Sequence, residues 1–184
     1  MKKIIITSIL CVLLVGCKSL KTAYYDAHTV VNTPSAPSQV IINYDVDEFT
    51  QQAWLTTEYH HSDFKDNNYS NGIVYKFRSL YKGGSPSFTQ IYFSLKLPDW
   101  YFVDKAIGKG GHEFEFIRID RETWSAGNVY ETFAINLNES EMNFLKEADY
   151  DIKIIGKRGS EVITISSIVA KAFSQRQESF SQDN

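Results

Sequence analysis

From Gln39 onward, hydrophobic and polar residues mostly alternate along the chain, which is the period of a β-strand with one buried face. The clearest stretch is 73–82, where apolar side chains occupy one side and basic side chains occupy the other. A Gly-Gly-Ser-Pro sequence then predicts a turn, and residues 90–97 repeat the alternation, so the two stretches form a predicted antiparallel hairpin. This pattern assigns eight residues to the core: Ile73, Tyr75, Phe77, Ile91, Phe93, Leu95, Phe133 and Ile135.

The second half of the chain departs from simple alternation. Across residues 112–121 the apolar positions shift by one residue, which indicates either a β-bulge or a strand buried on both faces. Asn138 and Glu141 have the spacing of a capping box and predict a short helix. A second helix is expected to begin at the Ser166-Ser167 pair, and the polar residues 175–184 predict a C-terminal tail.

These elements predict a mainly β fold. About seven or eight strands separated by turn signals, with two short helices near the C-terminus, favour an antiparallel β-sandwich or a partly open barrel over repeated strand-helix-strand units. Residues 39–174 are expected to form this single domain. The preceding residues 17–38 contain two prolines among small residues and predict a flexible tether. The pairs Tyr24-Tyr25 and Val30-Val31 interrupt this segment, and the alternative is that part of it docks on the fold.

The first 16 residues have the organisation of a secretory signal. Two lysines precede an apolar run from Ile4 to Gly16, which is shorter than the roughly 20 residues needed to span a bilayer. The run ends in Leu14-Val15-Gly16-Cys17, which resembles the lipobox of bacterial lipoproteins. The resemblance implies that residues 1–16 are cleaved and that the Cys17 sulfur carries a diacylglycerol. An ordinary signal peptide or an uncleaved anchor is the alternative.

The resemblance also implies a location. A lipidated Cys17 would anchor the domain in the bacterial cell envelope, with the membrane as its first partner. Lys18 follows the cysteine, and it is not the aspartate that holds lipoproteins at the inner membrane in enteric-type sorting. The outer membrane is therefore the expected location in a Gram-negative source.

Charge and cysteine content narrow the possible functions. Loss of the two signal lysines lowers Lys+Arg from 19 to 17 against 22 acidic residues, so the formal charge changes from −3 to −5. This acidic balance argues against nucleic acid as a partner and against a polybasic membrane patch. With Cys11 removed and Cys17 acylated, no cysteine remains for a disulfide, and the hydrophobic core must hold the fold.

Three neighbouring residues could ligate a metal. His60, His61 and Asp63 offer two imidazoles and a carboxylate within four positions, the residue types that bind zinc. Adjacent residues of a strand point to opposite faces, so both histidines could bind one ion only in irregular backbone. A structural or solvated role is the favoured interpretation, and no cofactor is expected.

Carboxylates are the other catalytic candidates. Glycoside hydrolysis needs two of them across a cleft, and the possible members of such a pair are Glu113, Glu115, Asp120, Glu122 and Glu131. Glu113 and Glu115 alternate with phenylalanines, which is typical of the solvent face of a strand. No Gly-x-Ser-x-Gly motif is present, and no free thiol would survive maturation. An enzyme is therefore the less favoured class.

The aromatic run Trp100-Tyr101-Phe102 is the candidate binding element. Consecutive residues of an extended chain cannot all face one core, so at least one ring is expected to be exposed near a strand end. Trp100 and Tyr101 are the candidate binding residues. The favoured alternative places Trp100 and Phe102 in the core and makes Tyr101 an ordinary surface tyrosine. The function expected from the sequence is a tethered, non-catalytic binding or accessory domain that acts on an envelope protein or glycan. A metal-dependent or glycoside hydrolase is the alternative.

Overall fold

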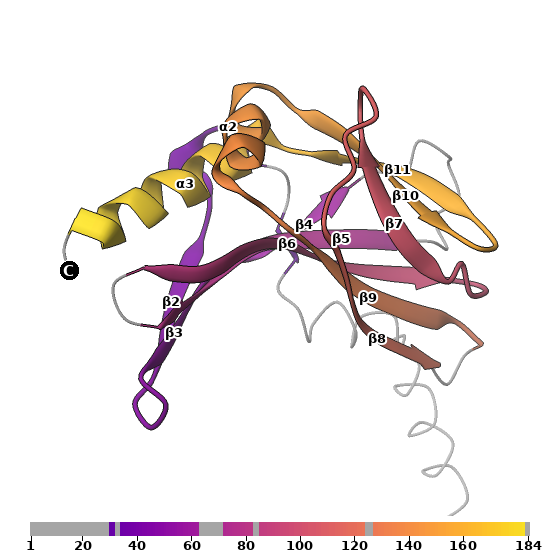
Figure 1. The fold of residues 1–184 in the computed structure, drawn as a ribbon, viewed down its shortest axis with the longest axis horizontal. Helices are drawn as coiled ribbons and strands as arrows, with labels where there is room; N and C mark the ends of the chain where they lie inside the picture. Colours follow the sequence, from indigo (N-terminus) through magenta and orange to yellow (C-terminus); the bar gives the residue numbers. More distant parts are fainter. Residues whose placement is uncertain (1–29, 32–33, 63–71, 83–84, 124–126, 183–184) are drawn as a thin grey trace, which may run out of the picture.

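A computed structural model describes residues 30–31, 34–62, 72–82, 85–123 and 127–182. The fold is mainly β, with antiparallel sheets and two α-helices near the C-terminus, which confirms the sequence prediction. Figure 1 shows one large bent sheet, with a small sheet and both helices on the same side of it. Within the described ranges, no helix has the length and hydrophobicity needed to cross a membrane.

The large sheet has eight strands in the order β1-β4-β5-β6-β9-β8, and β2 and β3 are joined to it through the pairing of β3 with β5. All of its ladders are antiparallel except that between β1 and β4. Its strands are β1 (Val30–Val31), β2 (Ile42–Asp47), β3 (Gln52–Thr57), β4 (Tyr59–Ser62), β5 (Gly72–Lys82), β6 (Pro86–Leu97), β8 (Phe116–Thr123) and β9 (Val129–Asn136).

The small sheet has three antiparallel strands in the order β11-β10-β7. Its strands are β7 (Val103–Gly108), β10 (Tyr150–Gly156) and β11 (Ser160–Ile165). The helices are a 3₁₀ turn η1 (Pro37–Gln39), α2 (Glu139–Glu147) and α3 (Ser167–Gln182).

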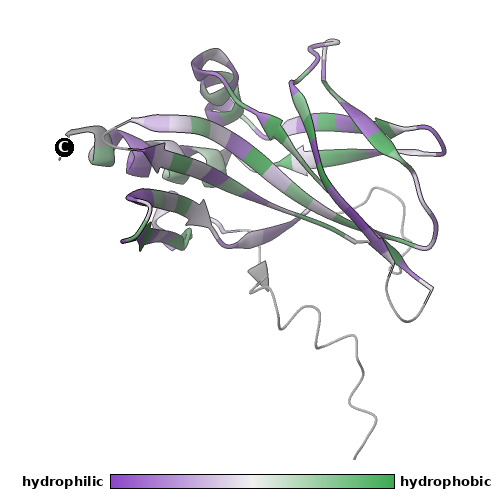
Figure 2. Cartoon of the chain, turned by 60° about the horizontal axis from the view of Figure 1, so that its bottom comes forward, coloured by the Kyte–Doolittle hydropathy of each residue, from purple (hydrophilic) through white to green (hydrophobic). Residues whose placement is uncertain are grey.

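The core lies between the large sheet and the layer formed by the small sheet and the helices. All eight residues that the alternation assigns to the core are buried. Figure 2 shows the alternation as bands of opposite hydropathy along the long strands. Phe93 stacks on Phe133 with ring centres 5.0 Å apart, and Phe77 reaches Phe173 of α3 at 5.5 Å. Aromatic contacts therefore link neighbouring strands to each other and the sheet to the helix.

Two local predictions are confirmed. The β8–β9 register shifts between Arg118 and Asp120, so the phase change marks a β-bulge, and Ile119 at the bulge is exposed. Asn138 Oδ1 accepts from the Glu141 N–H, and Glu141 Oε2 accepts from the Asn138 N–H. This reciprocal capping box starts α2.

Ordered elements extend beyond both ends of the predicted domain. Val30 and Val31 pair with β4 and η1 follows, so part of the expected tether belongs to the fold. Helix α3 continues to Gln182, where a polar tail was expected after Ser174. The helix extends because Gln177 Nε2 donates to the hydroxyls of Ser79 and Thr89, which anchors its second half to the sheet.

Candidate functional site

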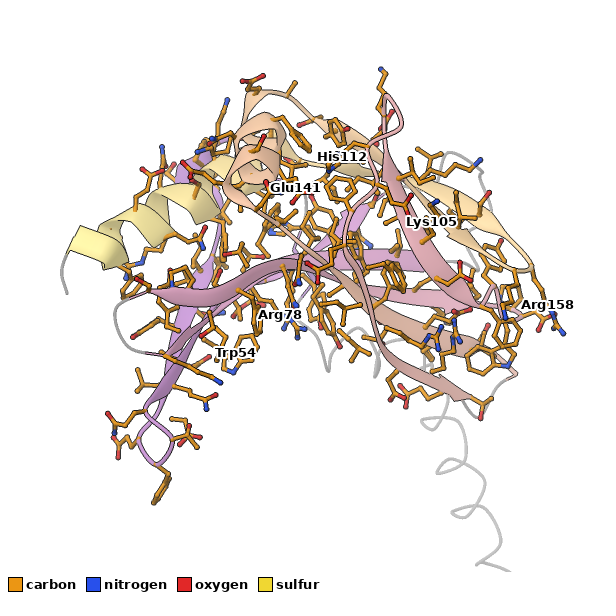
Figure 3. All side chains as sticks on the ribbon, viewed as in Figure 1. Trp54, Arg78, Lys105, His112, Glu141 and Arg158 are labelled. Carbon is orange, nitrogen blue, oxygen red and sulfur yellow. The ribbon has the colours of Figure 1, made fainter. Side chains whose placement is uncertain are left out.

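Two basic residues of β5 lie on the face of the large sheet that points away from the helices. Lys76 and Arg78 alternate with the buried Tyr75 and Phe77, so their side chains project from the opposite face. Their side chains are nevertheless half-buried. In Figure 3, Arg78 lies beneath the bent sheet, on its inner curve.

Aromatic rings surround both cations. Lys76 Nζ lies 4.6 Å from the centre of the Tyr59 ring and 5.5 Å from that of Tyr92. The Arg78 guanidinium carbon lies 4.3 Å from the Tyr92 ring centre and 5.4 Å from that of Trp54. We call these five residues the cationic–aromatic face. Four strands contribute to it, because β3, β4 and β6 all pair with β5.

Hydrogen bonds fix the Arg78 guanidinium. Its Nε and Nη2 atoms both donate to Gln90 Oε1, at 2.9 and 2.7 Å. Gln90 Nε2 in turn donates to Asn136 Oδ1 at 2.7 Å. Arg78 is therefore oriented by a neutral amide chain that crosses β6 and β9 and supplies no negative charge.

Neither cation of the face forms a salt bridge with a residue of the described ranges. Among the residues that the structure describes, no carboxylate oxygen lies within 4.0 Å of Lys76 or Arg78. Burial, followed by the neighbouring Arg78 charge, lowers the pKa of Lys76, and the carboxylate of Glu58 opposes this shift. Burial also lowers the pKa of Arg78. Two adjacent, partly desolvated positive charges are electrostatically costly without an anion beside them.

The predicted binding residues Trp100 and Tyr101 lie in the link between β6 and β7. The buried Glu131 organises this link, because its carboxylate accepts hydrogen bonds of 2.7 to 2.8 Å from three successive backbone N–H groups, those of Tyr101, Phe102 and Val103. Phe102 has a φ of 56°, which aligns the three donors. Arg121 Nε also donates to Glu131, at 3.1 Å.

The structure brings Tyr101 into the packing of the β10–β11 hairpin. Its hydroxyl donates to Glu161 Oε1 at 2.9 Å, and its carbonyl accepts from the Arg158 N–H at 3.0 Å. Its ring lies so close to Gly159 that a Cβ there would approach ring carbons to 2.7 Å. Trp100 stacks on Phe102 with ring centres 6.0 Å apart. These contacts give Tyr101 a structural role, and binding at Trp100 and Tyr101 stays a prediction.

The structure separates the candidate metal ligands. His60 faces the core with 1% of its surface exposed, whereas the next residue, His61, is exposed on the other face of β4. Asp63 lies outside the described residues. Burial lowers the pKa of His60 to about 4, and neither of its ring nitrogens has a hydrogen-bond partner among the described residues. No cluster of three His, Cys, Asp or Glu residues able to hold a metal occurs in the described ranges.

Two of the candidate carboxylates for hydrolysis have other partners. Glu113 pairs with Lys105 at 2.8 Å, and Glu131 holds the β6–β7 link. A pair that the sequence did not indicate joins His112 Nε2 to the buried Glu141 Oε1 at 2.7 Å (Figure 3). Glu141 also caps α2, so this pair fastens the β7–β8 connection to that helix.

Sequence reasoning placed Lys76 and Arg78 only on a solvent-facing side of a strand. The cationic–aromatic face depends on which strands pair with β5, and the alternation pattern does not contain that information. The predicted lipidation site, Cys17, lies outside the described residues. No protein-family model, curated protein or solved structure matches this chain.

Proposed function

We propose that this protein is a membrane-tethered, non-catalytic binding domain that holds an anionic glycan of the cell envelope on the cationic–aromatic face. The tether is the lipid on Cys17 that the lipobox resemblance implies. The observation that carries the proposal is the pair of half-buried cations, Lys76 and Arg78, which have no carboxylate partner among the described residues.

The energetics favour a ligand over a purely structural role. Each cation–aromatic contact contributes about 0.5 to 2 kcal/mol, which offsets part of the desolvation cost. A carboxylate in place of either tyrosine would have neutralised the charge more fully. A surface on which two half-buried cations contact aromatic rings and an amide, with no salt bridge to a described carboxylate, is suited to an anion that arrives from outside.

The aromatic rings favour a glycan as the carrier of that anion. Trp54 and Tyr92 are half-buried, so part of each ring is accessible. Flat rings of this kind stack on the apolar faces of sugars, and an arginine beside them recognises a carboxylate or sulfate. An uronic acid or sulfated sugar would use both features of the face at once.

Retention on charged polymers tests the proposal. The full chain, extracted in detergent, is applied to resins carrying polygalacturonate, dextran sulfate or neutral dextran at one salt concentration. We expect retention on the anionic resins, and we expect the Lys76→Gln/Arg78→Gln double variant to lose it.

The matched control is Lys153→Gln/Lys157→Gln, which removes the same charge from exposed positions of β10 and the following turn. This control is expected to bind as the wild type does. If both double variants lose retention equally, the binding reports net charge alone and the proposed face is wrong.

A further inference from the structure

The β2–β3 hairpin forms an arm that extends away from the body of the protein (Figure 1). Its outer strand, β2, pairs with β3 and with no other described strand. Apolar side chains along the arm are unusually open: Tyr44 is 42% exposed, Val46 is 54% exposed and Phe49 at the tip is 99% exposed. A free strand edge with apolar side chains is a template for pairing with another chain.

The β2–β3 ladder shows which backbone N–H and C=O groups of β2 point away from β3. The Glu58 N–H donates to the Ile41 carbonyl, so Ile41 and Glu58 form a hydrogen-bonded pair. This pair lies one step before the first pair of the β2–β3 ladder, Ile42 and Thr57. Hydrogen-bonded and non-hydrogen-bonded pairs alternate along an antiparallel ladder. The N–H and C=O groups of Ile42, Tyr44 and Val46 therefore point outward, to the open edge.

We propose that β2 pairs antiparallel with β2 of a second copy of this chain, across a two-fold axis at Tyr44. In this register Tyr44 faces its own equivalent and Ile42 faces Val46, so all the outward backbone groups of these residues gain partners. Asn43 faces Asp45, an amide opposite a carboxylate. An axis at Asp45 would instead place two carboxylates opposite each other, which is unfavourable.

The same register would place Phe49 of one copy in a cavity of the other copy. It sets the tip of each arm beside residues 37–41 of the other copy. A cavity of about 510 Å³ lies there, with walls from η1, the start of β2 and α3: Pro37, Ser38, Ile42, Ala172, Gln175 and Arg176. The phenyl ring of Phe49 from the second copy fits this mostly apolar space.

Charge supports the same pairing. The arm tip carries Asp47 and Glu48 beside Phe49, whereas the cavity wall carries Arg176. Because the contact is isologous, each copy offers one tip and receives the other, and the assembly closes as a dimer. This dimer is independent of the cationic–aromatic face and would form whether or not that face binds a glycan.

Disulfide trapping tests the register on the full chain in detergent. Tyr44→Cys places two thiols on the axis, where paired residues have Cα atoms about 5.5 Å apart, so oxidation is expected to give a covalent dimer. Val46→Cys is the matched control, because its two copies would lie about 13 Å apart, four residues along the strand. The parent chain, with only Cys11 and Cys17, gives the background.

Sedimentation of the unoxidised proteins tests whether Phe49, at the tip of the arm, contributes to dimerisation. Phe49→Ser leaves the fold unaffected because the side chain is fully exposed, and it is expected to raise the dimer dissociation constant at least tenfold. A monomeric wild type at about 100 µM, or trapping of Val46→Cys as efficiently as Tyr44→Cys, overturns the proposal.

Discussion

The Arg78 guanidinium carbon lies 4.3 Å above the centre of the Tyr92 ring, on the side of the sheet opposite the core. Arg78 and Tyr92 belong to adjacent strands and are not directly opposite, so the guanidinium leans diagonally across the ladder. Its two hydrogen bonds to Gln90 hold that orientation. The positive charge is thus fixed in direction, and no carboxylate in the described ranges forms a salt bridge with it, which is the arrangement expected of a preorganised anion site.

The buried His60 makes the fold sensitive to acid. Its pKa is about 4 in the folded protein and 6.5 in an exposed histidine. The unfolded chain therefore binds more protons between these values, and stability falls as the pH falls. We expect about 2 kcal/mol of the loss between pH 7.5 and 5 to come from this residue.

Urea denaturation of the wild type and of His60→Leu at several pH values measures that contribution. Leucine has a similar volume and no titratable group, so the variant should lose less stability over the same range. Parallel pH profiles for the two proteins would show that His60 does not carry the effect.

Phe93 is the clearest core residue, since it is fully buried and stacks on Phe133. Phe93→Ala is expected to lower the unfolding free energy by about 3 to 5 kcal/mol, because it removes a ring and leaves a cavity. Phe49→Ala deletes the same ring from a 99% exposed position and should change the monomer's stability by less than about 0.5 kcal/mol. Similar losses in both would contradict the assigned core.

Glu131 is expected to be essential for the β6–β7 link. Glu131→Gln replaces one acceptor oxygen by a donor, which leaves a backbone N–H or the Arg121 guanidinium without its partner. We expect a loss of about 2 to 4 kcal/mol in the unfolding free energy. Glu122→Gln, one strand away and exposed, is the control and should be neutral. A neutral Glu131→Gln would show that the carboxylate does not hold the link.

Lipidation of Cys17 has a direct test. Cys17→Ser removes the sulfur that would receive the diacylglycerol, so the protein is expected to leave the membrane fraction or to accumulate unprocessed. Fractionation followed by mass spectrometry of the N-terminus distinguishes these forms. Unchanged membrane partition and processing of the variant would exclude the lipid anchor.

Much of the fold could be predicted because a strand with one buried face has hydrophobic and polar residues in alternation. Phe77 and Phe93 sit at core positions that alternation alone identifies, and the capping box of Asn138 and Glu141 is a local signal. The extent of α3 could not be predicted, because Gln177 is polar and becomes a helix anchor only when Ser79 and Thr89 lie beside it.

The candidate site was harder to predict because it, too, depends on contacts between residues that are distant in the sequence. Lys76 and Arg78 have the spacing of any solvated strand face, and their environment is created by Tyr59 and Trp54, which come from strands paired through non-local contacts. The sequence instead drew attention to Tyr101, where consecutive aromatic residues are obvious but the hydroxyl bond to Glu161 is not.

Replacement of Lys76 by methionine tests the central claim most directly, because Lys76 lies against two aromatic rings and forms no salt bridge with a described residue. Methionine keeps the length of the side chain and removes the charge. Calorimetric titration with a short sulfated oligosaccharide should show a dissociation constant at least about tenfold higher than for the wild type, while the unfolding free energy stays within about 1 kcal/mol. Wild-type affinity in Lys76→Met, or a loss of affinity matched by unfolding, would contradict a binding role for this face.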